Sequence, residues 1–301
     1  MSATQPPSLK VGDHIGIIST ARKILPNQID TALRIFTDWG LKIKIGKHLY
    51  REDNQFSGTD LERVEDLQNM IDDPEVKAII CARGGYGTTR IIDDINFDSF
   101  QENPKWIAGF SDVTAIICHL NNKRIQSIHS IMPILFDEKN VASSIQSLKK
   151  ALFGELIEIE SPPHSLNIPG KAEGEVIGGN LTIITHLIGT RSGINTKDKI
   201  LFIEDIDEYL YHIDRMMIQL KRTGMLRNLK GLIVGQMTAM NDNEVPFGKN
   251  SYEIIHEHIK DLGIPVCFQF PVGHEVGNFA IPCSRQGHLN VTEPRVSLGF
   301  Y

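Results

Sequence analysis

The sequence lacks the features that mark several protein classes. It has no surplus of basic residues, since 31 Lys and Arg stand against 37 Asp and Glu and the net charge is −6. That balance gives no electrostatic footprint for nucleic acid or for an anionic membrane surface. No apolar run approaches the length of a membrane span, and residues 1–7 lack the basic and apolar regions of a secretory signal. We expect a cytoplasmic protein whose partner is a small molecule or a peptide.

Cysteine is also scarce. The four cysteines, Cys81, Cys118, Cys267 and Cys283, are widely separated and form no C-x-x-C pair. Three of the four lie in apolar segments. Neither a disulfide framework nor a zinc site is predicted, and the thiols are expected in the core. With 41% hydrophobic residues, 301 residues suffice for one large domain or two ordinary ones.

The first half of the chain alternates short β-rich runs with segments of helical periodicity. The expected strands are 15–19, 41–45, 78–81, 106–110 and 125–128, and the expected helices are 28–39, 61–71 and 112–121. This order predicts an α/β fold with a doubly wound, mostly parallel sheet, whose ligand sites lie at the carboxyl ends of the strands.

The pattern weakens after residue 137 into one helix, 142–152, and a proline-rich stretch, 161–165. It then resumes with further strands, including 200–203 and 232–234, and helices between them. We predict an N-terminal α/β domain over 1–140, a linker region over 141–171 and a smaller C-terminal α/β domain over 172–301.

Ser111 lies at the junction of an expected strand and an expected helix. Trp106–Phe110 is apolar, and helical spacing begins at Asp112. A serine there faces the unpaired N–H groups at the start of the helix, which can stabilise an oxyanion beside its hydroxyl. An ordinary N-cap is the alternative, and a G-x-S-x-G elbow is incomplete because Val113 stands at the second glycine position.

A nucleophilic serine needs a base, and the base needs an acceptor that fixes its tautomer. Among eleven histidines, His274 lies in a glycine-flanked loop after an apolar run, and His129, after the strand 125–128, is the second candidate. Glu204 follows the apolar run 200–203 and is the candidate carboxylate. The neighbouring acids suggest a metal site, but no histidine follows at ligand spacing, so no metal is predicted.

A glycine-rich loop, Arg83-Gly84-Gly85-Tyr86-Gly87, follows the strand 78–81. It lacks the lysine and the spacing of nucleotide-phosphate loops. Backbone N–H groups of Gly85 and Asp112 could instead form an oxyanion hole, with a tight turn as the alternative.

Five segments in order resemble the successive motifs of the LD-carboxypeptidase family of serine peptidases, which includes relatives that confer immunity to peptide-nucleotide antibiotics. They are residues 83–87, Gly109-Phe110-Ser111-Asp112, Gly178-Gly179-Asn180-Leu181, Ile203-Glu204-Asp205 and Gly273-His274. The resemblance covers nearly the whole chain.

The resemblance implies a Ser111-Glu204-His274 triad without metal or cofactor, divided between two domains, in a homodimer. It further implies removal of the terminal D-alanine from L,D-linked murein tetrapeptides during cell-wall recycling, through an acyl-enzyme. Arg83 could bind the substrate carboxylate, or pair with an aspartate. Asn180 could bind peptide backbone, although capping the next helix is favoured.

Two other functions remain open on the sequence. One keeps the triad but cleaves peptide-nucleotide antibiotics, for which the segment 187–199 shows no aromatic-rich insertion. The other is a non-catalytic protein whose two lobes close on a solute, with Ser111 serving as an anion site at a helix N-terminus.

Overall fold

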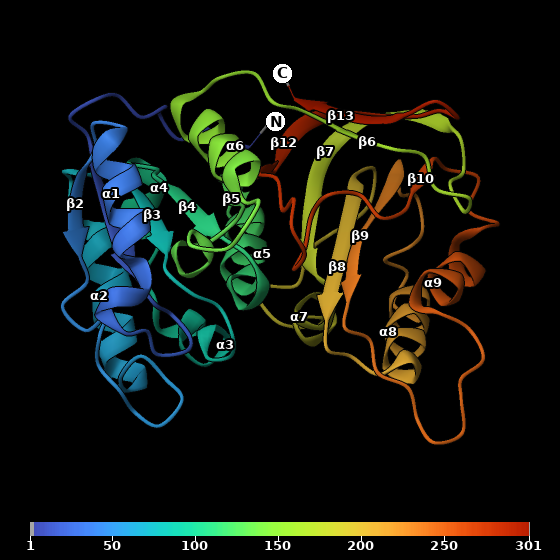
Figure 1. The fold of residues 1–301 in the computed structure, drawn as a ribbon, viewed down its shortest axis with the longest axis horizontal. Helices are drawn as coiled ribbons and strands as arrows, with labels where there is room; N and C mark the ends of the chain where they lie inside the picture. The colour runs from blue at the N-terminus through green and yellow to red at the C-terminus, as the bar shows by residue number, and fades with distance from the viewer. Residues whose placement is uncertain (1–2, 301) are drawn as a thin grey trace.

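A computed structural model describes residues 3–300 of the chain as two α/β halves, each built on one sheet (Figure 1). The first half, blue to green, and the second half, yellow to red, lie side by side with α5 (Thr114–Asn122) and α7 (Leu181–His186) between the sheets. The predicted fold class is confirmed.

The first sheet has the order β11-β5-β4-β3-β1-β2. Its strands are β1 (His14–Ile18), β2 (Lys42–Ile45), β3 (Val76–Cys81), β4 (Trp106–Gly109), β5 (Ser127–His129) and β11 (Ile281–Cys283). All pair in parallel except β11, which runs antiparallel to β5. Strands β3, β4 and β5 are almost entirely buried, as expected of parallel strands covered by helices on both faces.

The remaining helices of this half are α1 (Asp30–Asp38), α2 (Asp60–Asp72), α3 (Thr88–Ile91), α4 (Asp98–Glu102) and α6 (Ala142–Phe153). Two of them have recognisable capping signals at one end. Thr59 and Glu62 form a capping box at the start of α2, and Gly154 ends α6 in the left-handed conformation, with φ 75°. The helix expected from residue 112 begins at Thr114, because residues 111–113 form a 3-10 turn.

The second sheet has the order β10-β9-β8-β7-β12-β13-β6. Its strands are β6 (Glu158–Ser161), β7 (Gly170–Asn180), β8 (Ile200–Ile206), β9 (Gly231–Thr238), β10 (Val266–Cys267), β12 (Arg285–Val291) and β13 (Val296–Phe300), and its other helices are α8 (Leu210–Arg222) and α9 (Ser251–Ile259). Strands β7 to β10 are parallel, and antiparallel β12, β13 and β6 extend the sheet. Over residues 3–300 this sheet has seven strands, against six in the first.

The two halves share elements and a core. β11, from the second half of the sequence, completes the first sheet, and β6, within the predicted linker 141–171, completes the second. One continuous apolar cluster contains Trp106 of the first sheet, Leu148 of α6 and Phe202 of the second sheet. The domain boundaries predicted from the sequence stay a prediction, but the chain crosses between the sheets more than once.

Within residues 3–300, all four cysteines are buried thiols, and no helix combines the length and apolar character needed to cross a membrane.

Consecutive glycines at the end of β7 let α5 approach the second sheet. Gly179 has φ 145°, and a Cβ there would lie 2.6 Å from both Cγ2 and Oγ1 of Thr114. The next residue, Asn180, donates its backbone N–H to Thr114 Oγ1 over 3.1 Å. Because α5 begins just after Ser111, this close approach joins the serine-bearing turn directly to the second sheet.

Gly179→Ala should therefore lower the free energy of unfolding by about 2 kcal/mol or more, through backbone strain and the contact with Thr114. Gly189→Ala is the matched control, because Gly189 also has positive φ (85°) but open space around it, so that only about 1 kcal/mol of strain applies. Urea denaturation of both variants measures the difference, and equal losses would contradict the packing argument.

Candidate active site

Ser111 occupies a strained turn directly after β4. Its φ is 61°, whereas Phe110 before it is extended and the helical turn begins at Ser111 itself. A non-glycine residue in this region is uncommon and is typical of a sharp strand-to-helix elbow that exposes a nucleophile. A Cβ on Gly84 would lie 3.3 Å from Ser111 Oγ. The predicted glycine-rich loop therefore passes directly over the hydroxyl.

His274 and Glu204, chosen from the sequence 70 residues apart, form a hydrogen bond. His274 Nδ1 lies 2.7 Å from Glu204 Oε2, and the carboxylate side chain is 0% exposed against 12% for the imidazole. The strand predicted to end at Ile203 continues to Ile206, with a register irregularity between Ile203 and Asp205. Glu204 thus lies within β8, at a bulge, where a strand can redirect a side chain.

This pairing controls the charge of the imidazole. Burial lowers the pKa of His274, but the charge and the hydrogen bond of Glu204, together with the charge of Asp205, outweigh it and hold the pKa above the ordinary value of 6.5. With Nδ1 bonded to Glu204, Nε2 is the nitrogen left for proton exchange.

The serine turn and the His274 loop are in contact. The ring of Phe110, the residue before Ser111, lies 4.7 Å from the imidazole of His274, centroid to centroid. Three distant segments therefore meet at one place: the end of β4, the bulge of β8 and the loop that follows β10.

Comparison with known proteins shows the family of the chain. Residues 15–130 match the model of the LD-carboxypeptidase N-terminal domain, and residues 173–289 match that of the LD-carboxypeptidase C-terminal domain. The chain belongs to the LD-carboxypeptidase family. A probable murein peptide carboxypeptidase of Bacillus subtilis is 35% identical over 96% of this chain and 92% of its own length. The murein tetrapeptide carboxypeptidase of Pseudomonas aeruginosa is 27% identical over 93% and 94%.

Solved structures agree on the fold. A muramoyltetrapeptide carboxypeptidase from Oxalobacter formigenes superposes with a TM-score of 0.86 at 25% identity, over 95% of this chain and 98% of its own. The microcin C7 self-immunity protein MccF gives 0.88 at 22% identity, over 100% and 99%. The family match and the murein carboxypeptidase relatives show that the chain is a serine carboxypeptidase. This decides against the alternative of a non-catalytic binding protein.

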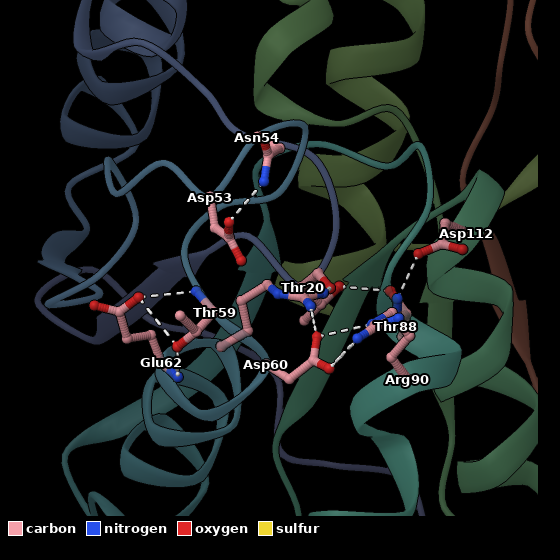
Figure 2. Close-up of polar contacts among 10 residues, drawn as sticks. Thr20, Asp53, Asn54, Thr59, Asp60, Glu62, Thr88, Arg90 and Asp112 are labelled. Carbon is pink, nitrogen blue, oxygen red and sulfur yellow. Dashed lines mark hydrogen bonds and ion pairs between the residues drawn. The ribbon is translucent and has the colours of Figure 1, made fainter.

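The glycine-rich loop of this LD-carboxypeptidase is fastened beside the serine turn. Gly85 and Gly87 have φ of 116° and 146°, which only glycine adopts readily. Beyond them, Thr88 donates its backbone N–H to Asp112 Oδ2 over 2.8 Å, and its hydroxyl lies 2.8 Å from that of Thr20 (Figure 2). No role was predicted for the side chain of Asp112, which is 1% exposed, yet its bond to Thr88 joins the loop to the serine turn.

A buried arginine supports the same loop. Arg63, 1% exposed, donates to the backbone oxygen of Thr20 over 2.8 Å and pairs with Asp60. Asp60 also binds Arg90, as Figure 2 shows. A Cβ on Gly87 would collide with the Arg63 guanidinium. Nothing in the local sequence distinguishes Arg63 from a surface arginine, so this support could not be predicted.

The predicted substrate-binding residues differ in how they are engaged. Arg83 is half-buried and donates to the backbone oxygen of Lys23 over 3.1 Å, and within residues 3–300 it forms no ion pair with an aspartate. Asn180 caps α7 by accepting from the N–H of Ile183 and donates to Asp205 over 2.8 Å. Capping, the favoured alternative, is therefore present, and the substrate contacts of Arg83 and Asn180 stay predictions.

Asp205, beside Glu204, binds the residues at the start of α7. It is 2% exposed and accepts from Asn180 and from the N–H and hydroxyl of Thr182. Burial, with the charge of Glu204, raises its pKa to about 6. The acidic cluster was visible in the sequence. The sequence did not show that Glu204 binds His274 while Asp205 binds the start of α7. In the described part of the chain, no group of three or more His, Cys, Asp and Glu is placed to hold a metal ion.

His129, the second candidate for the base, is fully buried. Burial lowers its pKa to about 4, so it is neutral near pH 7. Its Nε2 faces Asn278 Oδ1 at 3.2 Å, and its Nδ1 has no partner within residues 3–300. It is therefore badly placed to exchange protons with a substrate.

This depressed pKa predicts a pH-dependent stability. The unfolded chain binds a proton at His129 below pH 6.5 while the folded chain resists it until about pH 4, so stability from this group is complete above 6.5 and is lost as pH falls toward 4. The loss is at most about 3 kcal/mol. Urea denaturation at pH 7.5 and 4.5 should show a smaller drop for His129→Phe than for the wild type. Asp205 acts oppositely in this range but is present in both proteins, so an equal drop would contradict the assignment.

Proposed function

We propose that this LD-carboxypeptidase removes the C-terminal D-alanine from L,D-linked murein tetrapeptides, as part of cell-wall peptide recycling. Ser111 is the nucleophile, His274 the general base and acid, and Glu204 the group that orients the imidazole. The curated relatives named for murein peptides and the Oxalobacter structure support this substrate class. The cytoplasmic location and the homodimer stay predictions.

The bond between His274 Nδ1 and Glu204 Oε2 carries the proposal, together with the strained Ser111 turn beside it. A buried carboxylate fixes the tautomer so that Nε2 carries the lone pair, and it stabilises the imidazolium that forms when the serine proton is taken. An imidazole of raised pKa is a stronger base for taking the serine proton.

The reaction then has two halves. Ser111 Oγ attacks the carbonyl carbon of the third residue, His274 Nε2 takes the hydroxyl proton, and the tetrahedral intermediate collapses as His274 passes that proton to the departing D-alanine nitrogen. His274 next takes a proton from water, whose oxygen attacks the ester. The acid is released as the proton returns to Ser111 Oγ.

Backbone N–H groups of Gly85 and Asp112 are proposed to bind the oxyanion. Gly85 follows Gly84, which lies against Ser111, and no described residue accepts the Gly85 N–H. Arg83 is the proposed partner of the substrate carboxylate, since its guanidinium has donors left after the single bond to Lys23. The contact proposed for Asn180 would have to be shared with the cap of α7.

A cavity of about 570 Å³ adjoins the proposed triad and offers room for a peptide. His274 and the rest of the loop 273–278 line one side, and residues 131–144 line the other. The lining is mixed, with Ile131, Leu135 and Val276 beside Glu138 and Lys139. A peptide with both charged and aliphatic parts matches such a wall.

Cleavage of a peptide-nucleotide antibiotic remains the alternative, because the same triad could serve it and the fold of MccF is closely similar. Hydrolysis of a muropeptide measured beside that of a peptide-nucleotide separates the two functions. Cleavage of the nucleotide compound alone would favour the alternative.

Ser111→Ala should abolish release of D-alanine from a defined tetrapeptide, with a loss of roughly 10³-fold or more, because the acyl-enzyme cannot form. Mass spectrometry after incubation measures the product, using tetrapeptides with lysine and with diaminopimelate at the third position. Ser143→Ala, at an exposed position of α6 outside the lining of the cavity, is the control and should keep the activity. Unchanged release by Ser111→Ala would refute the proposed nucleophile.

Glu204→Gln should change both the rate and its pH dependence. In the wild type, kcat/KM should fall as pH drops through the pKa of His274, with a midpoint above 6.5. Removing the carboxylate charge should move that midpoint down and lower kcat by roughly 10³- to 10⁴-fold. A full pH–rate profile of both proteins tests this. An unchanged midpoint would show that Glu204 does not raise the pKa of the base.

A further inference from the structure

One buried histidine outside the triad contacts all three segments that carry it. The ring of His129 lies 5.6 Å from that of Phe110, before Ser111, and 5.2 Å from that of Phe202, two residues before Glu204. Its Nε2 lies 3.2 Å from Asn278 Oδ1, in the loop of His274. Its backbone pairs with Gly109 on β4 and with Ile281 on β11.

The hydrogen bonds define the state of this ring. Asn278 Oδ1 also accepts the backbone N–H of Gly273, the residue before His274, at 3.2 Å. Because a backbone N–H only donates, the Asn278 atom that faces it is the oxygen, and the same oxygen faces His129 Nε2. Nε2 therefore carries the proton, and the imidazole is the neutral Nε2–H form.

We propose that His129 is a positioning residue, which fixes the place of His274 relative to Ser111 and Glu204 by holding Asn278, and through it Gly273, against the aromatic pair Phe110 and Phe202. It transfers no proton, because it is fully buried and its ring packs against two phenylalanine rings. The contact acts on kcat, since misplacing a catalytic group by about 1 Å costs up to about 100-fold in rate.

The low pKa of His129 fits this role. A positive charge beside the buried Glu204 would attract the carboxylate away from His274, and burial prevents that charge near neutral pH. The charged groups around His274 itself are Glu204 and Asp205 on β8, Glu275 next in the chain, and three residues across the cavity, namely Asp137, Glu138 and Lys139. None of these is altered when His129 is replaced.

The test combines kinetics with a readout that needs no substrate. His129→Phe keeps a buried ring but removes the Nε2–H, and His129→Gln restores an N–H donor. For His129→Phe we expect kcat for D-alanine release to fall roughly 10- to 100-fold with KM changed less than about threefold. NMR titration of the His274 ring protons should show its pKa lowered by about half a unit or more, as the bond to Glu204 loosens. His129→Gln should recover part of both.

His119→Phe is the matched control. His119 is also buried, lies 5.0 Å from the ring of Phe97 and pairs with Ser192 Oγ at 3.0 Å, outside the three segments. Its replacement should leave kcat and the His274 pKa unchanged. If His129→Phe does not fold, as judged by circular dichroism, Asn278→Ala removes the same contact between His129 and the loop of His274. It should lower the pKa of His274 by a similar amount.

An unchanged His274 pKa in a folded His129→Phe or Asn278→Ala protein would overturn the proposal, and so would an equal change in His119→Phe. The kinetic measurement rests on the proposed function, whereas the titration does not. Absence of D-alanine release by the wild type would therefore refute the function and leave the titration to decide the role of His129.

Discussion

The buried carboxylate of Glu204 is the constraint on which the rest of the site depends. A charge removed from water is costly unless it is paired, and Glu204 has one close partner, His274, supplied by a loop from a different part of the sheet. Its second oxygen has no hydrogen-bond partner within residues 3–300. The position of this loop is therefore coupled to the charge of Glu204. Asn278 binds the loop at Gly273 and is itself bound by His129.

Strain at Ser111 is the second element of the design. Ser111 keeps its left-handed backbone conformation because contacts with neighbouring segments hold it there. Asp112 is bound to Thr88, α5 is pressed against Gly179, and Gly84 covers the hydroxyl. The same contacts that impose the turn bring the glycine-rich loop and the second sheet to Ser111. The strain at Ser111 is therefore maintained by close packing of the surrounding segments.

The sequence predicted the parts of this structure that local chemistry determines. Alternation of apolar runs and helical segments predicted the parallel sheet, and Ser111, Glu204 and His274 were predicted as a triad because each follows or ends an apolar run beside small or polar residues. Long-range packing determined the rest. The antiparallel β11 on the first sheet, the bulge at Glu204, the burial of Arg63 and the contacts of His129 depend on segments distant in sequence. No local pattern could have shown them.

Covalent labelling of the serine tests the central claim most directly, namely that one hydroxyl is activated by His274 and Glu204. After reaction with a fluorophosphonate, trypsin should release residues 106–123, a fragment that contains Ser111 as its one serine, carrying the added mass. The label should be lost or greatly slowed in His274→Ala. A label on another fragment, or labelling of His274→Ala at the wild-type rate, would contradict the account.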